Sequence, residues 1–89
     1  MKHVQLTITG KVQGVWYRGS TQRKARKLGL CGFVCNRPDG SVYAEVEGPA
    51  AAVQALIDWC QQGPELAVVE KVEVVEGEPQ GFQQFEVRR

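Results

Sequence analysis

Apolar residues in this chain repeat every second residue in some segments and every third or fourth in others, and the order of the two periods leaves few folds open. In residues 3–9, Val4, Leu6 and Ile8 alternate with polar residues, which is typical of a strand with one buried face. Further strand-like runs lie at residues 30–36, 41–47 and 68–75, and a short last one at Phe85 and Val87.

Two other segments have the helical period. The first helix is expected over residues 20–28, with Ser20 or Thr21 as its N-cap. The second is expected between Pro49, which suits a first helical turn, and Gly63. Its apolar stripe consists of Val53, Leu56, Ile57 and Cys60.

The elements therefore follow in the order βαββαβ, with a short C-terminal strand added. This order is typical of a ferredoxin-like split βαβ sandwich, an α+β fold in which a predominantly antiparallel sheet carries both helices on one face. The other face is expected to be solvated, because polar residues alternate there: His3, Ser41, Tyr43, Glu45 and Glu47. A chain of 89 residues fits one such domain, over residues 1–89.

Composition narrows the classes of function. A net charge of +1 gives little attraction to nucleic acids or membranes. No run is apolar enough for a signal peptide or a membrane span, so a cytoplasmic protein is expected. The spacing of Cys31, Cys35 and Cys60 matches no zinc or redox motif, and we expect them to be reduced packing residues. The lone His3 is expected to be structural.

The segment between the first strand and the first helix, Gly10 to Arg18, is a candidate oxyanion site. A helix start presents unpaired N–H groups and a partial positive charge, so Arg18 beside it calls for an anion. Gly14 lets the backbone approach a ligand, and a guanidinium can make two parallel hydrogen bonds to phosphate or carboxylate oxygens. On these residues alone, a simple turn with a solvated Arg18 remains open.

Asn36 ends the second strand and is the second candidate. In a βαβ unit the first two strands are parallel, so the start of the first helix and the end of the second strand meet at one rim of the sheet. Asn36 would then face Arg18, where its amide can orient a water molecule. From the residue type alone, an Asx turn that opens the hairpin at Asp39-Gly40 is the favoured interpretation of Asn36.

The sequence GKVQGVWYR of residues 10–18 closely resembles the first signature of the acylphosphatases. The second signature resembles Gly32-Phe33-Val34-Cys35-Asn36 followed by Asp39-Gly40, Val42 and Gly48. Residues 81–88 are similar to the last strand of that family, so the resemblance covers essentially the whole chain. Tyr17 departs from the usual phenylalanine or methionine, and Cys35 from the usual basic residue, glutamine, alanine or methionine. If buried, the Tyr17 hydroxyl needs a partner.

The resemblance implies a hydrolase that cleaves acyl phosphates, which are mixed carboxylic-phosphoric anhydrides, to a carboxylate and inorganic phosphate. It implies that Arg18 and a phosphate-binding loop hold the phosphate, and that Asn36 orients the attacking water. The backbone of this loop belongs to Lys11, Val12, Gln13, Gly14 and Val15. It also implies no metal and no cofactor, a small acyl phosphate as partner, and a site that accepts phosphate or sulfate. The sequence does not determine the oligomeric state, and a monomer is the simplest expectation.

Two other functions remain open. One is a non-catalytic anion-binding or regulatory module that kept the loop without turnover. The other is an RNA-binding domain of the same fold, to which the cations of the first helix would contribute: Arg23, Lys24, Arg26 and Lys27. RNA-binding sheets carry aromatics on the open face, where only Tyr43 is a clear candidate, so a solvated helix face is the simpler interpretation.

Overall fold

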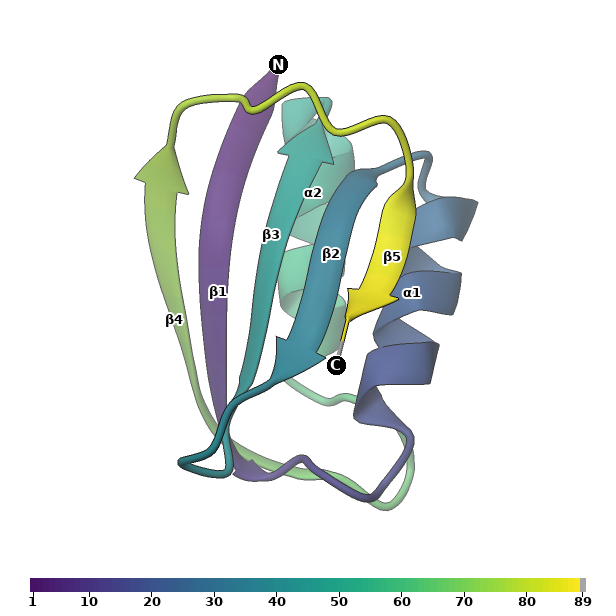
Figure 1. Cartoon of the computed structure of the whole chain (residues 1–89). Coiled ribbons are helices and arrows are strands. Elements are labelled where there is room, and N and C mark those ends of the chain that lie inside the picture. Colours follow the sequence, from purple (N-terminus) through teal and green to yellow (C-terminus); the bar gives the residue numbers. More distant parts are fainter. Residues whose placement is uncertain (89) are drawn as a thin grey trace.

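The computed structural model describes residues 1–88 as one five-stranded sheet with two helices on one face (Figure 1). The strands are β1 (Lys2–Lys11), β2 (Cys31–Asn36), β3 (Val42–Gly48), β4 (Val68–Gly77) and β5 (Phe85–Arg88), and the helices are α1 (Tyr17–Lys27) and α2 (Ala50–Cys60). The strand order is β4-β1-β3-β2-β5, and only the β2–β5 pair is parallel. The expected ferredoxin-like α+β fold is confirmed.

The alternating pattern of β1 builds the centre of the core. Val4, Leu6 and Ile8 are fully buried on the helix-covered face of the sheet. The predicted stripe of α2 is buried as well: Val53, Leu56, Ile57 and Cys60. Burying a valine, leucine or isoleucine side chain contributes roughly 1.5 to 3 kcal/mol, so these two patterns supply much of what holds helix and sheet together.

Helix α1 begins three residues earlier than predicted, at Tyr17 instead of Ser20. Its N-cap is Trp16, in a left-handed conformation with φ 66°, and no side chain caps it. The Thr21 hydroxyl donates to the Tyr17 carbonyl at 2.7 Å, so it is used inside the helix. The predicted capping by Ser20 or Thr21 is therefore wrong, and Arg18 lies in the first helical turn.

Strand β1 continues through Gly10 to Lys11, so Gly10 is not the exit from the strand. The pairing with β4 shifts register between Thr9 and Gly10. Gly10 has φ 125°, and a Cβ there would overlap with the carbonyl oxygen of Val68. Only glycine allows this close approach of the two strands, and the chain turns away after it.

The open face of the sheet is partly covered, which corrects the expectation that it is solvated. Residues 78–84 run from β4 to β5 past the ends of the other strands (Figure 1). Phe82 of this segment stacks on His3, with 6.3 Å between ring centroids. His3 and Glu47 are each only 2% exposed, and Ser41 is buried too.

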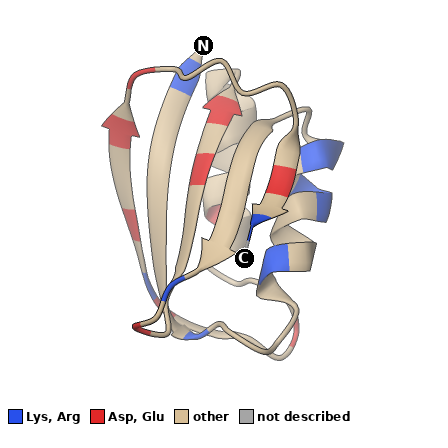
Figure 2. Ribbon diagram, viewed as in Figure 1, with Lys and Arg blue, Asp and Glu red and all other residues tan. Residues whose placement is uncertain are grey.

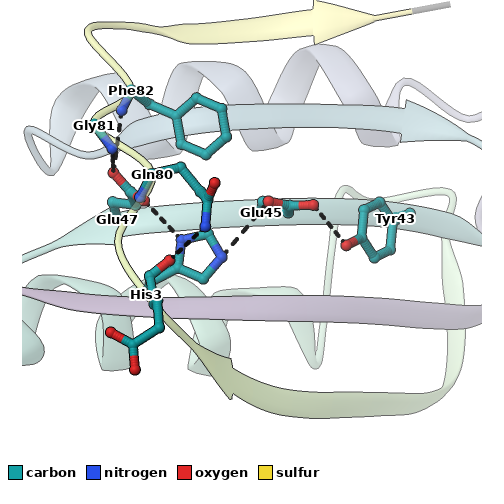
Figure 3. Close-up of polar contacts among 8 residues, drawn as sticks. His3, Tyr43, Glu45, Glu47, Gln80, Gly81 and Phe82 are labelled. Atoms are coloured by element: carbon teal, nitrogen blue, oxygen red, sulfur yellow. Dashed lines mark hydrogen bonds and ion pairs between the residues drawn. The ribbon is translucent and has the colours of Figure 1, made fainter.

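Figure 3 shows how the buried Glu47 carboxylate holds this segment. It accepts hydrogen bonds from Nδ1 of His3 at 2.8 Å, and from the backbone N–H groups of Gln80, Gly81 at 3.1 Å and Phe82 at 3.2 Å. We call His3, Glu47 and the N–H groups of residues 80–82 the C-terminal clasp. It fixes the segment that leads into β5.

Neither helix of residues 1–88 is long and apolar enough to cross a membrane.

Candidate active site

The start of α1 and the end of β2 enclose a cavity of about 480 Å³ at one rim of the sheet. Both predicted side chains, Arg18 and Asn36, line it. The other lining residues are Val12, Gly14, Trp16, Tyr17, Gly19 and Val87. The topological rule that parallel strands end at the same rim predicted this meeting, and the structure brings the two residues together.

The loop before α1 presents a row of backbone donors. Within residues 1–88, no hydrogen bond is donated by the N–H groups of residues 13–16. The first turn adds the N–H groups of residues 17–19, which have no intrahelical partner and no capping side chain. Gly14 has φ 76°, which turns the loop at no steric cost. This arrangement can bind an oxyanion.

The guanidinium of Arg18 adds a full positive charge to these donors. Its Nη1 donates to the carbonyl of Arg88 at 3.4 Å, which attaches it to β5. None of the ion pairs among the described residues involves Arg18, and the first turn of α1 contains no acidic residue. Within residues 1–88, no carboxylate pairs with this charge.

Asn36 has a buried side-chain oxygen, Oδ1, which lacks a hydrogen-bond partner among the described residues. The Asx turn that was the alternative for Asn36 is made by Asp39, whose Oδ1 accepts from the N–H of Ser41 at 2.9 Å and from its hydroxyl at 2.6 Å. These bonds from Ser41 lower the pKa of Asp39. A buried acceptor without a partner costs about 1 to 3 kcal/mol, which marks Asn36 as a place for a ligand or a water.

Three residues of the predicted loop do not line the cavity. Lys11 is exposed, and Val15 is buried in the core. The Nε2 of Gln13 donates to the carbonyls of Arg37 at 2.7 Å and Ser41 at 2.9 Å, which attaches the loop to the β2–β3 hairpin. Their side chains support the loop, so only their backbone can take part in binding.

Sequence reasoning gave no role in the site to Trp16, Gly19 and Val87. Trp16 and Gly19 flank residues that were singled out, so a closer look at the same segment could have found them. Val87 lies on β5 and reaches the cavity because β5 pairs in parallel with β2. No sequence pattern predicted that pairing.

Tyr17 faces the core below the cavity. Its hydroxyl donates to the carbonyl of Cys60 at 2.8 Å, so the predicted need for a partner is met. Its ring lies 5.7 Å from that of Trp59. Burial, with Cys60 as a second cause, raises the pKa of Tyr17 well above its usual range, and the phenol stays neutral.

The three cysteines are unpaired, as expected. Cys31 and Cys35 are half-buried, and Cys60 is buried. Burial raises the pKa of the Cys60 thiol to about 11, so it is a packing residue at neutral pH.

Positive charge gathers on α1 (Figure 2). Arg23, Arg26 and Lys27 are exposed, and Lys24 is half-buried, which fits the predicted solvated face. Lys24, Arg26 and Lys27 lie in the last turn, where they stabilise the negative end of the helix dipole. Among the described residues, no group of three or more histidine, cysteine or acidic side chains is arranged to hold a metal ion.

Comparison with known proteins agrees with the resemblance in sequence. A family model described as Acylphosphatase matches residues 4–87. An acylphosphatase from Gloeobacter violaceus is 54% identical, covering 92% of this chain and 88% of that protein. One from Thermococcus kodakarensis is 53% identical and covers 98% of both. The crystal structure of an acylphosphatase from Bacillus subtilis has a TM-score of 0.98 at 32% identity and covers all of both chains.

Proposed function

The chain belongs to the acylphosphatase family, and we propose that it hydrolyses acyl phosphates in the cavity between α1 and β2. The products are a carboxylate and inorganic phosphate. The observation that carries the assignment to this cavity is the buried Oδ1 of Asn36, which has no hydrogen-bond partner within residues 1–88, in a cavity that Arg18 also lines. The amide oxygen of Asn36 is suited to bind a water molecule, and the guanidinium of Arg18 is suited to bind a phosphate.

In this proposal the phosphoryl oxygens bind to Arg18 and to the unpaired N–H groups of the loop and of the first turn of α1. The predicted loop comprises Lys11, Val12, Gln13, Gly14 and Val15, and within residues 1–88 the N–H groups of Gln13, Gly14 and Val15 are unpaired. Bidentate hydrogen bonding by a guanidinium fixes the orientation of the phosphate as well as its charge. Inorganic phosphate or sulfate has the same oxygens and should compete for the site.

Asn36 accepts a hydrogen bond from the attacking water and aims its oxygen at phosphorus. A new P–O bond forms as the bond from phosphorus to the carboxylate oxygen breaks, and the carboxylate leaves with the electron pair. A carboxamide cannot act as a base near neutral pH, so one proton of the water passes to a phosphate oxygen. The product is dihydrogen phosphate.

This reaction requires few catalytic groups from the protein. A carboxylate is a good leaving group, so positioning and stabilisation of the phosphoryl charge are enough, without a protein nucleophile. Arg18 and the loop supply that stabilisation, and we propose that no metal is needed. Purified protein treated with EDTA is expected to release phosphate from benzoyl phosphate at an unchanged rate.

Two variants separate the roles of the catalytic residues. Arg18→Ala is expected to lower kcat/KM for benzoyl phosphate by about 10³ and to weaken inhibition by phosphate, because it removes a charge that binds both. Asn36→Ala is expected to lower kcat by about 10² while the inhibition constant of phosphate stays within about twofold. Steady-state kinetics with circular dichroism as a check on folding measures both.

Arg23→Ala is the matched control, because Arg23 is an exposed arginine on the same helix. It should leave kcat/KM for benzoyl phosphate and the inhibition constant of phosphate within about twofold. If Arg23→Ala lowered kcat/KM as much as Arg18→Ala does, general positive charge on α1 would be sufficient for activity. Full turnover by Asn36→Ala would refute the water-orienting role. Phosphate binding without any hydrolysis by the unsubstituted protein would make the chain a non-catalytic anion-binding module.

We also propose that residues 1–89 form a single domain that works as a monomer in the cytoplasm. Three unpaired cysteines support a reducing compartment. The charged residues and the bulge of the edge strand β4 support a monomer.

A further inference from the structure

Trp16 is a large apolar side chain held in solvent. It is 75% exposed, whereas its neighbours Val15 and Tyr17 are 8% and 1% exposed. It is also the one non-glycine residue among those described with a positive φ, at 66°. That conformation is strained for a bulky residue, and strain of this kind is typical of functional sites.

The left-handed turn determines where the indole goes. Trp16 is exposed between the buried Val15 and Tyr17, and its ring lies next to Gly19 in the first turn of α1. A Cβ on Gly19 would lie 2.7 Å from Cε3 and Cζ3 of the ring. Gly19 therefore leaves the space in which the ring lies, and any other residue there would displace it.

The indole lines the same cavity as the catalytic pair. Arg18 and Asn36 form its polar part, while Trp16, Val12 and Val87 form an apolar part, and none of the described residues that line it is acidic. An acyl phosphate has the same two parts: an anionic phosphoryl group and, one oxygen away, an acyl group. With the phosphoryl group on Arg18, the apolar part of the cavity is available to the acyl group.

We propose that Trp16 selects the acyl group, and that the chain prefers acyl phosphates with an aromatic acyl group, which stacks on the exposed indole. The inference rests on the proposed function, because it assigns the remaining part of the same substrate. An aromatic ring that stacks on tryptophan gains attraction beyond the area it buries, whereas an acetyl group gains almost none. Trp16 then determines specificity and takes no part in the chemistry.

The test compares benzoyl phosphate with acetyl phosphate, which share the phosphoryl group. Trp16→Ala is expected to lower the ratio of kcat/KM for benzoyl over acetyl phosphate by about tenfold, mainly through KM. Trp16→Phe keeps a ring and should hold the ratio within about threefold of the original. Leu66→Ala is the matched control, because Leu66 is an apolar residue that is 72% exposed outside the cavity, and it should leave the ratio unchanged.

Tryptophan fluorescence gives a second readout that needs no turnover. Benzylphosphonate should change the emission of the exposed Trp16, and methylphosphonate should not. Equal losses for both substrates in Trp16→Ala, or an unchanged ratio, would overturn the inference, as would identical fluorescence responses to the two phosphonates. Failure of the proposed function is seen separately, as absence of hydrolysis of both substrates by the unsubstituted protein.

Discussion

Two polar groups near the cavity, the Tyr17 hydroxyl and the Asn36 amide oxygen, are both buried but differ in their hydrogen bonding. The hydroxyl donates to the carbonyl of Cys60, the last residue of α2, whose carbonyl has no partner within its helix. The amide oxygen has no partner among the described residues. The hydrogen-bonded Tyr17 hydroxyl contributes to the stability of the fold. The Asn36 oxygen without a partner lowers that stability, and such a residue is expected where it takes part in the reaction.

Tyr17→Phe tests the first of these groups. The variant leaves the buried carbonyl of Cys60 without its donor, so the free energy of unfolding is expected to fall by about 1 to 2 kcal/mol. Urea denaturation followed by circular dichroism measures it. In the control Tyr43→Phe, the lost hydroxyl donates to Glu45 at 2.8 Å in a half-buried place, and the loss should stay below about 1 kcal/mol. An equal loss in both variants would contradict the role of the Cys60 carbonyl.

At the scale of elements, the C-terminal clasp decides how β5 is held. Strand β5 has four residues and pairs only with β2, so its position depends on the segment that precedes it. Glu47 at the end of β3 binds that segment through three backbone N–H groups, and His3 of β1 binds Glu47 in turn. The second ring nitrogen of His3 lies 3.5 Å from Glu45. Strands β1 and β3 and the segment before β5 are thus joined through one buried carboxylate.

The clasp predicts how stability depends on pH. Burial acts to raise the pKa of Glu47, but hydrogen bonds from Gln80, His3, Phe82 and Gly81 outweigh it, and the pKa in the folded protein lies below 4.5. The clasp therefore stabilises the folded state above about pH 4.5, and this contribution is lost as pH falls through the lowered pKa. Thermal unfolding between pH 7 and pH 3 measures the dependence.

Glu47→Gln is expected to lower Tm at pH 7 by at least about 4 °C, and to flatten the fall of Tm below pH 5. The matched control is Glu76→Gln, since Glu76 makes an exposed ion pair with Lys2 at 3.1 Å. It should change Tm by less than about 2 °C, because exposed pairs contribute little. A Tm that falls with acid equally in all three proteins would place the pH dependence elsewhere.

The periodic elements were predictable, because β1 and α2 each bury one face and their apolar spacing reports it. The start of α1 was not, since it depends on the left-handed Trp16 and on a Thr21 hydroxyl that bonds within the helix. The burial of His3 and Glu47 depends on residues 78–84, which are far away in sequence. From their polar character alone, both side chains were expected to be exposed to solvent. In the site, the topology of the sheet predicted that Arg18 and Asn36 lie at the same rim. It did not predict that Val87 of β5 lines the cavity, because this depends on the pairing of β5 with β2.

At the scale of the whole molecule, the sheet has two edges, β4 and β5. Strand β4 exposes Val68, Val74 and Val75, which would favour pairing with a second copy. The same strand carries the charged residues Glu70, Lys71, Glu73 and Glu76, and it has a bulge opposite Gly10. Charges and bulges at an edge oppose pairing, which supports a monomer.

Sedimentation velocity is expected to give the monomer mass of 9.9 kDa at micromolar concentrations. Replacing two of these charges with Lys71→Val and Glu73→Val together should produce dimers or larger species, because residues 71–75 of the edge strand then form an uninterrupted run of valines. The control Lys27→Val removes an exposed charge from α1 and should leave the mass unchanged. A dimer mass for the unsubstituted chain would contradict the monomer.

The attachment of Arg18 to the carbonyl of Arg88 has a consequence for synthesis on the ribosome. The loop, the arginine and the asparagine emerge early, but Val87 and the carbonyl that holds the guanidinium are made at the end of the described chain. A nascent polypeptide lacks one wall of its cavity until β5 has left the ribosome and paired with β2. Each molecule should therefore gain its full activity only when β5 has been made and has paired with β2.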